Sequence, residues 1–247
     1  MLGRLALTLG VLATAAMVNA AIPAPPTLKE ACGSTSGLKG QTFWLTSADG
    51  VRLYAVEAGS GSTTIVLAHE GNSDLCDTLP YGATLVAAGF RVLAFDFRGN
   101  GRSQAPTQNT LALGNDLAAA ARRSRDDGAQ HLFLAGASMG GAAVVQNTAA
   151  LDVDGRISFS GTRLWPGYGI NHYSDLPKVR APFLYLGTRD DSRAPLKEAL
   201  GIFRRIGTHD KHTAFYPGSW HGWDLVTSAP FAARTRALVL TWIRSHA

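Results

Sequence analysis

Apolar runs and amphipathic helical segments alternate along the sequence from residue 64 to the C-terminus. The runs are rich in β-branched and aromatic residues and have the length of strands; they lie at 64–70, 91–97, 131–138, 156–161, 181–191 and 212–218. Segments with helical spacing of apolar residues lie between or after them, at 79–90, 110–128, 139–152, 194–207 and 229–247. This alternation predicts a mainly parallel sheet with helices on both faces, because parallel neighbours are joined by helical crossovers.

An antiparallel hairpin is predicted ahead of this pattern. TFWLTS (42–47) and VRLYAVEAG (51–59) flank the turn sequence Ala-Asp-Gly. The chain shows no internal repeat and no linker that would divide it, and 46% of its 247 residues are hydrophobic, enough for one substantial core. We therefore expect a single α/β domain over 42–247, with a mostly parallel central sheet of about eight strands, helices on both faces and an antiparallel hairpin at the N-terminal edge.

The first twenty residues have the pattern of a secretory signal peptide. Arg4 precedes an uncharged apolar run at 5–18, and Val18 and Ala20 are small residues suited to cleavage after Ala20. An uncleaved membrane anchor is the alternative, but a bilayer span needs about 20 apolar residues. We expect a secreted, periplasmic or extracellular protein with a signal peptide at 1–20, an irregular segment at 21–41 and no transmembrane helix in the mature chain.

The distribution of charge bears on which partners the protein binds. Without the leader, 22 basic and 18 acidic side chains remain, and they are scattered. The densest basic cluster, at 121–128, is diluted by two aspartates and is typical of a solvated helix end, so we expect no nucleic-acid partner.

In an exported protein, the pair Cys32 and Cys76 favours a disulfide; two unpaired buried thiols are the alternative. The sequence has no Cys/His spacing typical of zinc, so we expect no metal.

The stretch GASMGG (136–141) places Ser138 between a predicted strand and a predicted helix. Gly136 and Gly140 give it the Gly-x-Ser-x-Gly spacing of a nucleophile elbow, a sharp turn that leaves no room for neighbouring side chains. The N-terminus of the following helix would supply free N–H groups and positive potential. A tight turn without chemistry is the alternative, but the strand–turn–helix context favours a nucleophile.

A serine nucleophile needs a base, and the base needs an orienting carboxylate. Asp190 and Asp191 follow one predicted strand, and His221 follows the last. Ligands bind at the carboxyl ends of parallel strands, so these side chains are expected at the same edge of the sheet as Ser138. The order Ser, Asp, His along the chain is that of the α/β-hydrolase triad.

Several motifs in this order resemble those of the α/β-hydrolase family, in particular its serine esterases and lipases. The resemblance covers residues 42–247. FDFRGNGRS (95–103) is similar to an Asp-x-Arg-Gly-x-Gly-x-Ser loop, GASMGG to the nucleophile elbow, GTRD (187–190) to the acid loop and LAHEGNSD (67–74) to the oxyanion loop. The resemblance implies the family's fold and a Ser138–His221–Asp190 triad, because Asp190 rather than Asp191 fits Gly-x-x-Asp.

The oxyanion loop departs from the family pattern. The family usually has glycine directly after the loop histidine, whereas here Glu70 lies between His69 and Gly71. The resemblance implies two backbone N–H donors for the oxyanion: that of Met139, and that of either Glu70 or Gly71, of which we favour Glu70. A carboxylate directed inward would repel the oxyanion, so we expect the Glu70 side chain to point away.

The segment at 162–180 is too short for the helical cap that members of the family often insert there. Trp165, Tyr168 and Tyr173 are candidates for lining a substrate pocket, with packing at the edge of the core as an equal alternative. His69 is a weaker candidate, because it is better placed to shape the oxyanion loop. Asp96 and Arg98 are expected to brace their glycine-rich turn.

The resemblance implies a hydrolase that cleaves small or lipid-like carboxylic esters through an acyl-enzyme, without a cofactor. Thioesterase, peptidase and cofactor-free perhydrolase activities are alternatives on the same triad, and a non-catalytic binding protein is a further one. The serine argues against haloalkane dehalogenases and epoxide hydrolases, which use aspartate at this position. The sequence names neither the ester nor the oligomeric state.

Overall fold

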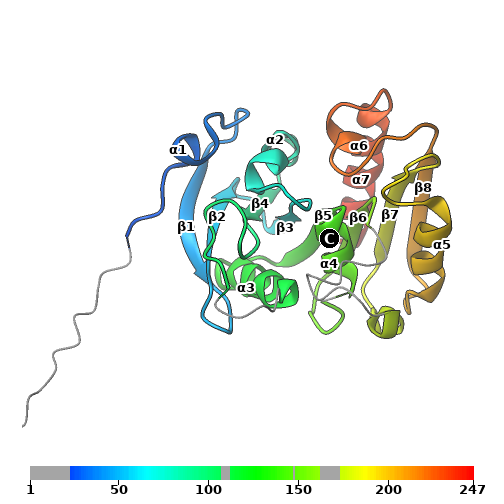
Figure 1. Cartoon of the computed structure of the whole chain (residues 1–247), viewed down its shortest axis with the longest axis horizontal. Coiled ribbons are helices and arrows are strands. Elements are labelled where there is room, and N and C mark those ends of the chain that lie inside the picture. Colours follow the sequence, from blue (N-terminus) through cyan, green and yellow to red (C-terminus); the bar gives the residue numbers. More distant parts are fainter. Residues whose placement is uncertain (1–22, 107–111, 147, 162–172) are drawn as a thin grey trace, which may run out of the picture.

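The structure, a computed structural model, describes residues 23–106, 112–146, 148–161 and 173–247. These residues form one eight-stranded sheet with the strand order β1-β2-β4-β3-β5-β6-β7-β8 (Figure 1). The predicted fold class is confirmed, including the number of strands. The strands are β1 (Gly40–Thr46), β2 (Arg52–Ala58), β3 (Thr63–Ala68), β4 (Arg91–Phe95), β5 (His131–Ala137), β6 (Gly155–Phe159), β7 (Phe183–Thr188) and β8 (Lys211–Tyr216).

Because most strands are parallel, the loops that follow them lie together at one edge of the sheet. Strands β3 to β8 all run parallel, and β1 and β2 form the predicted antiparallel hairpin at one side. At the centre, Ala68 of β3 pairs with both Phe95 of β4 and Gly136 of β5. The loops that follow β3, β4 and β5 therefore leave the sheet side by side, and those after β6, β7 and β8 emerge at the same edge.

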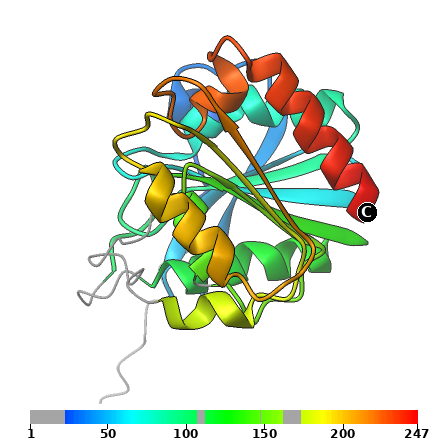
Figure 2. The ribbon, with the colours of Figure 1, turned by 90° about the vertical axis from the view of Figure 1, so that its right-hand side faces the viewer.

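Helices cover both faces of the sheet and enclose two apolar cores (Figures 1 and 2). One core lies beneath α3 (Leu113–Asp126), α4 (Met139–Gln146), the 3-10 helix η3 (Tyr173–Lys178) and α5 (Leu196–Arg205). The other lies beneath α1 (Leu28–Cys32), the 3-10 helix η1 (Leu75–Thr78), α2 (Leu79–Ala87), α6 (Asp224–Thr227) and α7 (Ala232–His246). No helix within the described ranges is long and apolar enough to span a bilayer.

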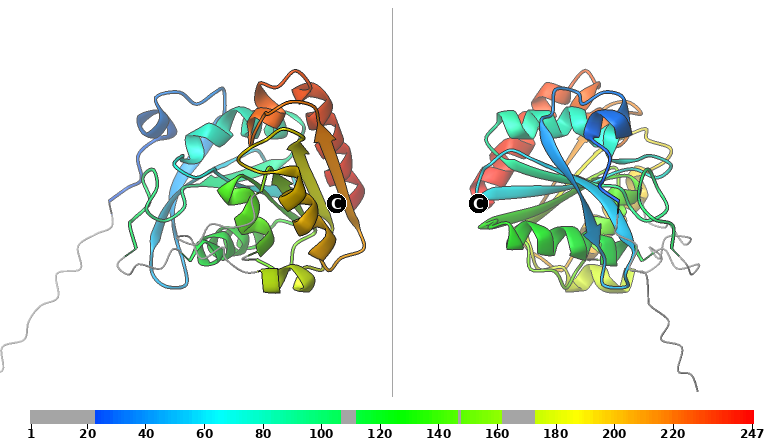
Figure 3. Two further views of the ribbon diagram at one scale, coloured as in Figure 1. Left: turned by 45° about the vertical axis from the view of Figure 1, so that its right-hand side comes forward. Right: turned by 90° about the vertical axis from the view of Figure 1, so that its left-hand side faces the viewer.

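The segment at 21–41, predicted to be irregular, contains the helix α1 and the start of β1. The helix forms because Thr27 and Glu30 make a capping box, in which each side chain satisfies a backbone N–H of the other. Cys32, at the end of α1, is joined by a disulfide to Cys76 in η1, as predicted. The segment thus packs beside the sheet hairpin, as both views in Figure 3 show.

Candidate active site

Ser138 stands on a strained turn between β5 and α4. Its φ is +50°, a left-handed conformation that costs a residue with a side chain about 1–3 kcal/mol. A Cβ on Gly136 would overlap the backbone of Gly140, and a Cβ on Gly140 would overlap the carbonyl oxygen of Ala68. The Ser138 N–H donates to the Phe159 carbonyl at the end of β6, 2.9 Å away. The glycines are therefore required sterically, and the sheet holds the strained serine in place.

His221 and Asp191 form a buried pair above the ends of β8 and β7. The Nδ1 atom of His221 lies 2.5 Å from Oδ2 of Asp191, and both residues are almost fully buried. Oδ1 of Asp191 accepts hydrogen bonds from the backbone N–H groups of Arg193 and Ala194. An ionised Asp191 fixes the proton of His221 on Nδ1, which leaves Nε2 to act as a base.

The hydrogen bonds of Asp191 lower its pKa by more than burial raises it. Burial alone would raise the pKa of the carboxyl group, but the hydrogen bond and the charge of His221, together with the two backbone donors, bring the pKa of Asp191 below its ordinary value. The Asp191 carboxylate is therefore ionised at neutral pH, as the partner of a histidine base must be.

The prediction of Asp190 as the partner of His221 is wrong. Asp190 is exposed, and its Oδ2 accepts from the Gly218 N–H while its own N–H donates to the Gly218 carbonyl. Strand β7 ends at Thr188, and the chain then turns so that only the second aspartate faces the interior. Asp190 instead ties the loop after β7 to the loop after β8.

The loop after β8 reaches back over the sheet toward Ser138. We define residues 217–223, between β8 and α6, as the histidine loop. Strands β5 and β8 are three positions apart, which is about 14 Å. The Trp223 N–H nevertheless donates to the Glu70 side chain in the loop after β3, the neighbour of β5. His221 is thereby carried from the edge strand toward Ser138.

The described residues include no direct hydrogen bond between Ser138 and His221. Catalytic hydrogen bonds are often long before substrate binds and tighten only in the complex. The ring of Trp223 packs on Phe159, whose carbonyl holds the Ser138 backbone, with 5.3 Å between ring centroids. This packing couples the histidine loop to the turn at Ser138 without involving the side chains of Ser138 and His221.

His69 is a brace, not a substrate-binding residue. It is fully buried, and the Phe97 N–H donates to its Nε2 at 2.9 Å. Nε2 is therefore an acceptor, so Nδ1 carries the proton and donates to the Glu70 carbonyl at 2.6 Å. Burial lowers the pKa of His69 to about 4 and keeps the ring neutral. The predicted substrate contact is wrong because both ring nitrogens are already used to shape the loop that follows β3.

Two further side chains brace the loops around the site, as predicted. Burial raises the pKa of Asp96 to about 7, and its carboxyl oxygens accept from the N–H groups of Leu75 and Arg102, each 2.7 Å away. Arg98 is buried and forms ion pairs with Asp116 and Asp49. The glycine-rich turn after β4 is thus tied both to η1 and to α3.

A cavity of about 470 Å³ opens beside His221. The side chains of the histidine loop and α6 form one wall, Glu70 and the start of η1 form another, and Arg193 borders it from the loop after β7. Its lining residues are Ser36, Glu70, Cys76, Asp77, Pro80, Arg193, His221, Trp223, Asp224 and Thr227. Arg193, Trp223 and Asp224 belong to no motif of the sequence, so the pattern could not have indicated them. The predicted pocket residues Trp165 and Tyr168 lie outside the described residues.

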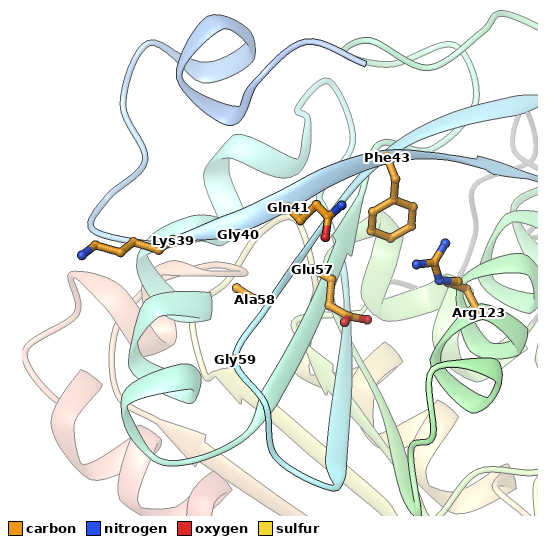
Figure 4. A pocket seen from close by; sticks show the side chains of 8 residues that line it. All are labelled: Lys39, Gly40, Gln41, Phe43, Glu57, Ala58, Gly59 and Arg123. Atoms are coloured by element: carbon orange, nitrogen blue, oxygen red, sulfur yellow. The ribbon is translucent and has the colours of Figure 1, made fainter. Parts of the chain in front are cut away.

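A second cavity, of about 450 Å³, lies between the hairpin of β1 and β2 and Arg123 of α3 (Figure 4). It is lined by Lys39, Gly40, Gln41, Phe43, Glu57, Ala58, Gly59 and Arg123. None of these residues belongs to the loops at the carboxyl ends of the parallel strands, and β2 is separated from β5 by two strands. This cavity is therefore distinct from the site around Ser138.

Known proteins share both the local sequence pattern and the fold. A family model described as serine aminopeptidase, S33, matches residues 60–165, which include Ser138. No curated protein matches the chain. An esterase of Pyrococcus furiosus has 16% sequence identity and a TM-score of 0.72, with 91% of this chain and 97% of that chain covered.

Two other solved structures extend this similarity. A monoacylglycerol lipase of Paleococcus ferrophilus shows 16% identity and a TM-score of 0.67, over 79% of this chain and 99% of its own. A predicted hydrolase of Thermoplasma acidophilum shows 22% identity and a TM-score of 0.64, over 85% of this chain and 100% of its own. At these identities the similarity is one of fold.

Proposed function

We propose that this chain, which has the α/β-hydrolase fold, is a secreted serine hydrolase that cleaves carboxylic esters with Ser138, His221 and Asp191. The observation that carries the proposal is the buried hydrogen bond between Asp191 and His221, at the sheet edge where Ser138 stands on its strained turn. The solved esterase and the solved lipase of the same fold support the choice of ester substrates.

The mechanism follows from the positions of these groups. Ser138 Oγ attacks the acyl carbon while Nε2 of His221 removes its proton, and the resulting imidazolium is stabilised by Asp191. The imidazolium then donates the proton to the departing alkoxide, which leaves as an alcohol. Water, deprotonated by His221, attacks the acyl-enzyme and releases the carboxylic acid and free Ser138.

Backbone N–H groups would stabilise the oxyanion of each tetrahedral intermediate. Met139 is the first residue of α4, where N–H groups have no carbonyl partner within the helix. The second donor is the Glu70 N–H, in the loop that His69 holds rigid. Loss of one such donor typically costs about 10² to 10³ in turnover.

Export is supported by two independent features. The leader pattern at 1–20 predicts translocation, and the Cys32–Cys76 disulfide is of a kind that persists in oxidising compartments. N-terminal sequencing of the protein recovered from culture medium or periplasm tests this part of the proposal. A mature chain that starts at Ala21 is expected, and an intact leader in the cytoplasm would contradict it.

Peptidase activity is a second candidate, favoured by the description of the matching family model. A panel of p-nitrophenyl esters, matched thioesters and aminoacyl p-nitroanilides separates the two activities. The ester proposal expects the highest kcat/KM on esters, with all activity lost in Ser138→Ala. Higher kcat/KM on the anilides would favour the peptidase, and an equally active Ser138→Ala protein would overturn both.

A further inference from the structure

Glu70 joins the loop after β3 to the histidine loop. Its Oε1 accepts a hydrogen bond from the Trp223 N–H, 2.8 Å away. Gly222 has a φ of +56°, and a Cβ at this position would overlap the Glu70 carboxylate. The carboxylate therefore packs directly on the main chain that follows His221, and a glycine is needed there for this contact.

The backbone of the loop after β3 lies against the turn that carries Ser138. A Cβ on Gly140, in the first turn of α4, would meet the carbonyl oxygens of Ala68 and His69. His69 fixes the Glu70 carbonyl through Nδ1. The base of the Glu70 side chain is thus anchored beside Ser138, while its carboxylate reaches the loop that carries His221.

Burial and the groups around Glu70 act on its pKa in opposite directions. His221 and Arg193, on the loops after β8 and β7, attract the carboxylate, and Asp224 at the start of α6 repels it. Burial raises the pKa of Glu70 above its ordinary value, and the Trp223 N–H, His221 and Arg193 offset only part of that rise. His221 is also paired with Asp191.

We propose that Glu70 is a positioning residue, whose carboxylate clamps the histidine loop through the Trp223 N–H and whose negative charge favours the imidazolium form of His221. This inference rests on the proposed function, because it assigns His221 the role of base. It also explains the departure from glycine after the loop histidine: the added side chain supplies a direct connection between the two loops.

The hydrogen bond that Glu70 accepts and its negative charge can be tested separately by substitution. Glu70→Gln keeps an amide oxygen that accepts from Trp223 N–H but removes the charge. Glu70→Ala removes both and leaves the backbone N–H of residue 70 in place. Glu57→Gln is the matched control, because burial also raises the pKa of Glu57, which lies on β2 and lines the distant cavity (Figure 4).

The experiment measures kcat and KM of p-nitrophenyl butyrate hydrolysis from pH 5 to 9 for the wild type and these variants. We expect Glu70→Ala to lower kcat at least about tenfold with KM within about threefold, because the base is misplaced while binding is retained. Glu70→Gln should retain more of kcat than Glu70→Ala, because it keeps the acceptor for the Trp223 N–H. Its acid limb of kcat/KM should move to lower pH by about half a unit, because the imidazolium has lost a stabilising charge. Glu57→Gln should match the wild type in both.

The outcomes distinguish this inference from the proposed function. Wild-type kcat in Glu70→Ala, or an unmoved acid limb in Glu70→Gln, overturns the role of Glu70 if Ser138→Ala is inactive. Activity in Ser138→Ala overturns the proposed function itself, whatever the Glu70 variants do. Should Glu70→Ala fail to fold, the acid limb of Glu70→Gln alone decides whether the charge acts on His221.

Discussion

Asp191 holds the imidazole of His221, and Glu70 holds the backbone of Trp223 in the same loop. The two carboxylates come from loops that follow different strands, β7 and β3. One contacts the imidazole itself, and the other contacts the backbone of Trp223, two residues further along. A histidine carried on a long loop is thereby fixed at two points.

The two adjacent aspartates should differ sharply in their effect on catalysis. Asp191→Asn removes the charge that stabilises the imidazolium and disturbs its tautomer, so we expect kcat/KM for esters to fall by about 10³ to 10⁴. Asp190→Asn changes an exposed residue that is hydrogen-bonded to Gly218, away from His221, and kcat/KM should stay within about twofold of wild type. Steady-state kinetics on one ester decides between them, and a larger loss in Asp190→Asn would contradict the assignment.

The strained conformation of Ser138 should be visible in stability. Ser138→Gly relieves the left-handed strain, whereas Ser138→Ala keeps a Cβ at φ +50°. We expect the glycine variant to have a free energy of unfolding about 1 kcal/mol higher than the alanine variant, although both are inactive. Chemical denaturation of the two variants measures this difference, and an equal or lower stability of the glycine variant would argue against strain at the elbow.

His69 should make the free energy of unfolding depend on pH. Its pKa is about 4 in the folded protein and about 6.5 in the unfolded chain, so the unfolded chain binds more protons between these values. The contribution of neutral His69 is therefore present above pH 6.5 and is lost as the pH falls toward 4, by about 3 kcal/mol in all. The raised pKa of Asp96 has the opposite effect on the free energy of unfolding, which it increases as the pH falls over an overlapping pH range.

Because of that overlap, His69 is isolated by comparing wild type with His69→Asn. The variant loses the acceptor for the Phe97 N–H and should be less stable at pH 7 by about 1–3 kcal/mol. The difference in unfolding free energy between the two proteins should shrink from pH 6.5 to pH 4. A difference that stays constant across this range would show that His69 does not titrate as inferred.

The disulfide should contribute measurably to stability. Cys32 and Cys76 are separated by 44 residues, and a loop of this size predicts about 3–4 kcal/mol from the chain entropy of the unfolded state. The double variant Cys32→Ser/Cys76→Ser should therefore unfold at lower denaturant concentration than the oxidised wild type. Reduction of the wild type should reproduce the shift, and coincident unfolding curves for all three would refute the contribution.

The repeating pattern of the chain specifies the fold, but the details of the site depend on side-chain direction. Alternation of strands and helices is sufficient to predict the parallel sheet, and the spacing of glycines around Ser138 is sufficient to predict the elbow. The choice between Asp190 and Asp191 depends on how the chain turns after Thr188, and no motif encodes that turn. The sequence pattern does not indicate helix α1, because its capping box, Thr27 to Glu30, lies in a segment rich in proline and glycine.

His69 and Glu70 show why neighbouring residues of one motif can differ in role. The sequence indicates only that both follow a buried strand. Burial and two backbone partners make His69 a neutral brace, whereas the Trp223 N–H, far away in sequence, determines the direction of Glu70. Contacts over 153 positions of chain separation cannot be inferred from local periodicity.

Covalent labelling of the nucleophile tests the central claim most directly. The protein would be incubated with a fluorophosphonate, digested and analysed by mass spectrometry, with Ser138→Ala and His221→Ala as comparisons. The account predicts one adduct, on the peptide that contains Ser138, absent in Ser138→Ala and formed at least about 100-fold more slowly in His221→Ala. An unlabelled wild type with intact fold, or an adduct on another residue that persists in Ser138→Ala, would contradict it.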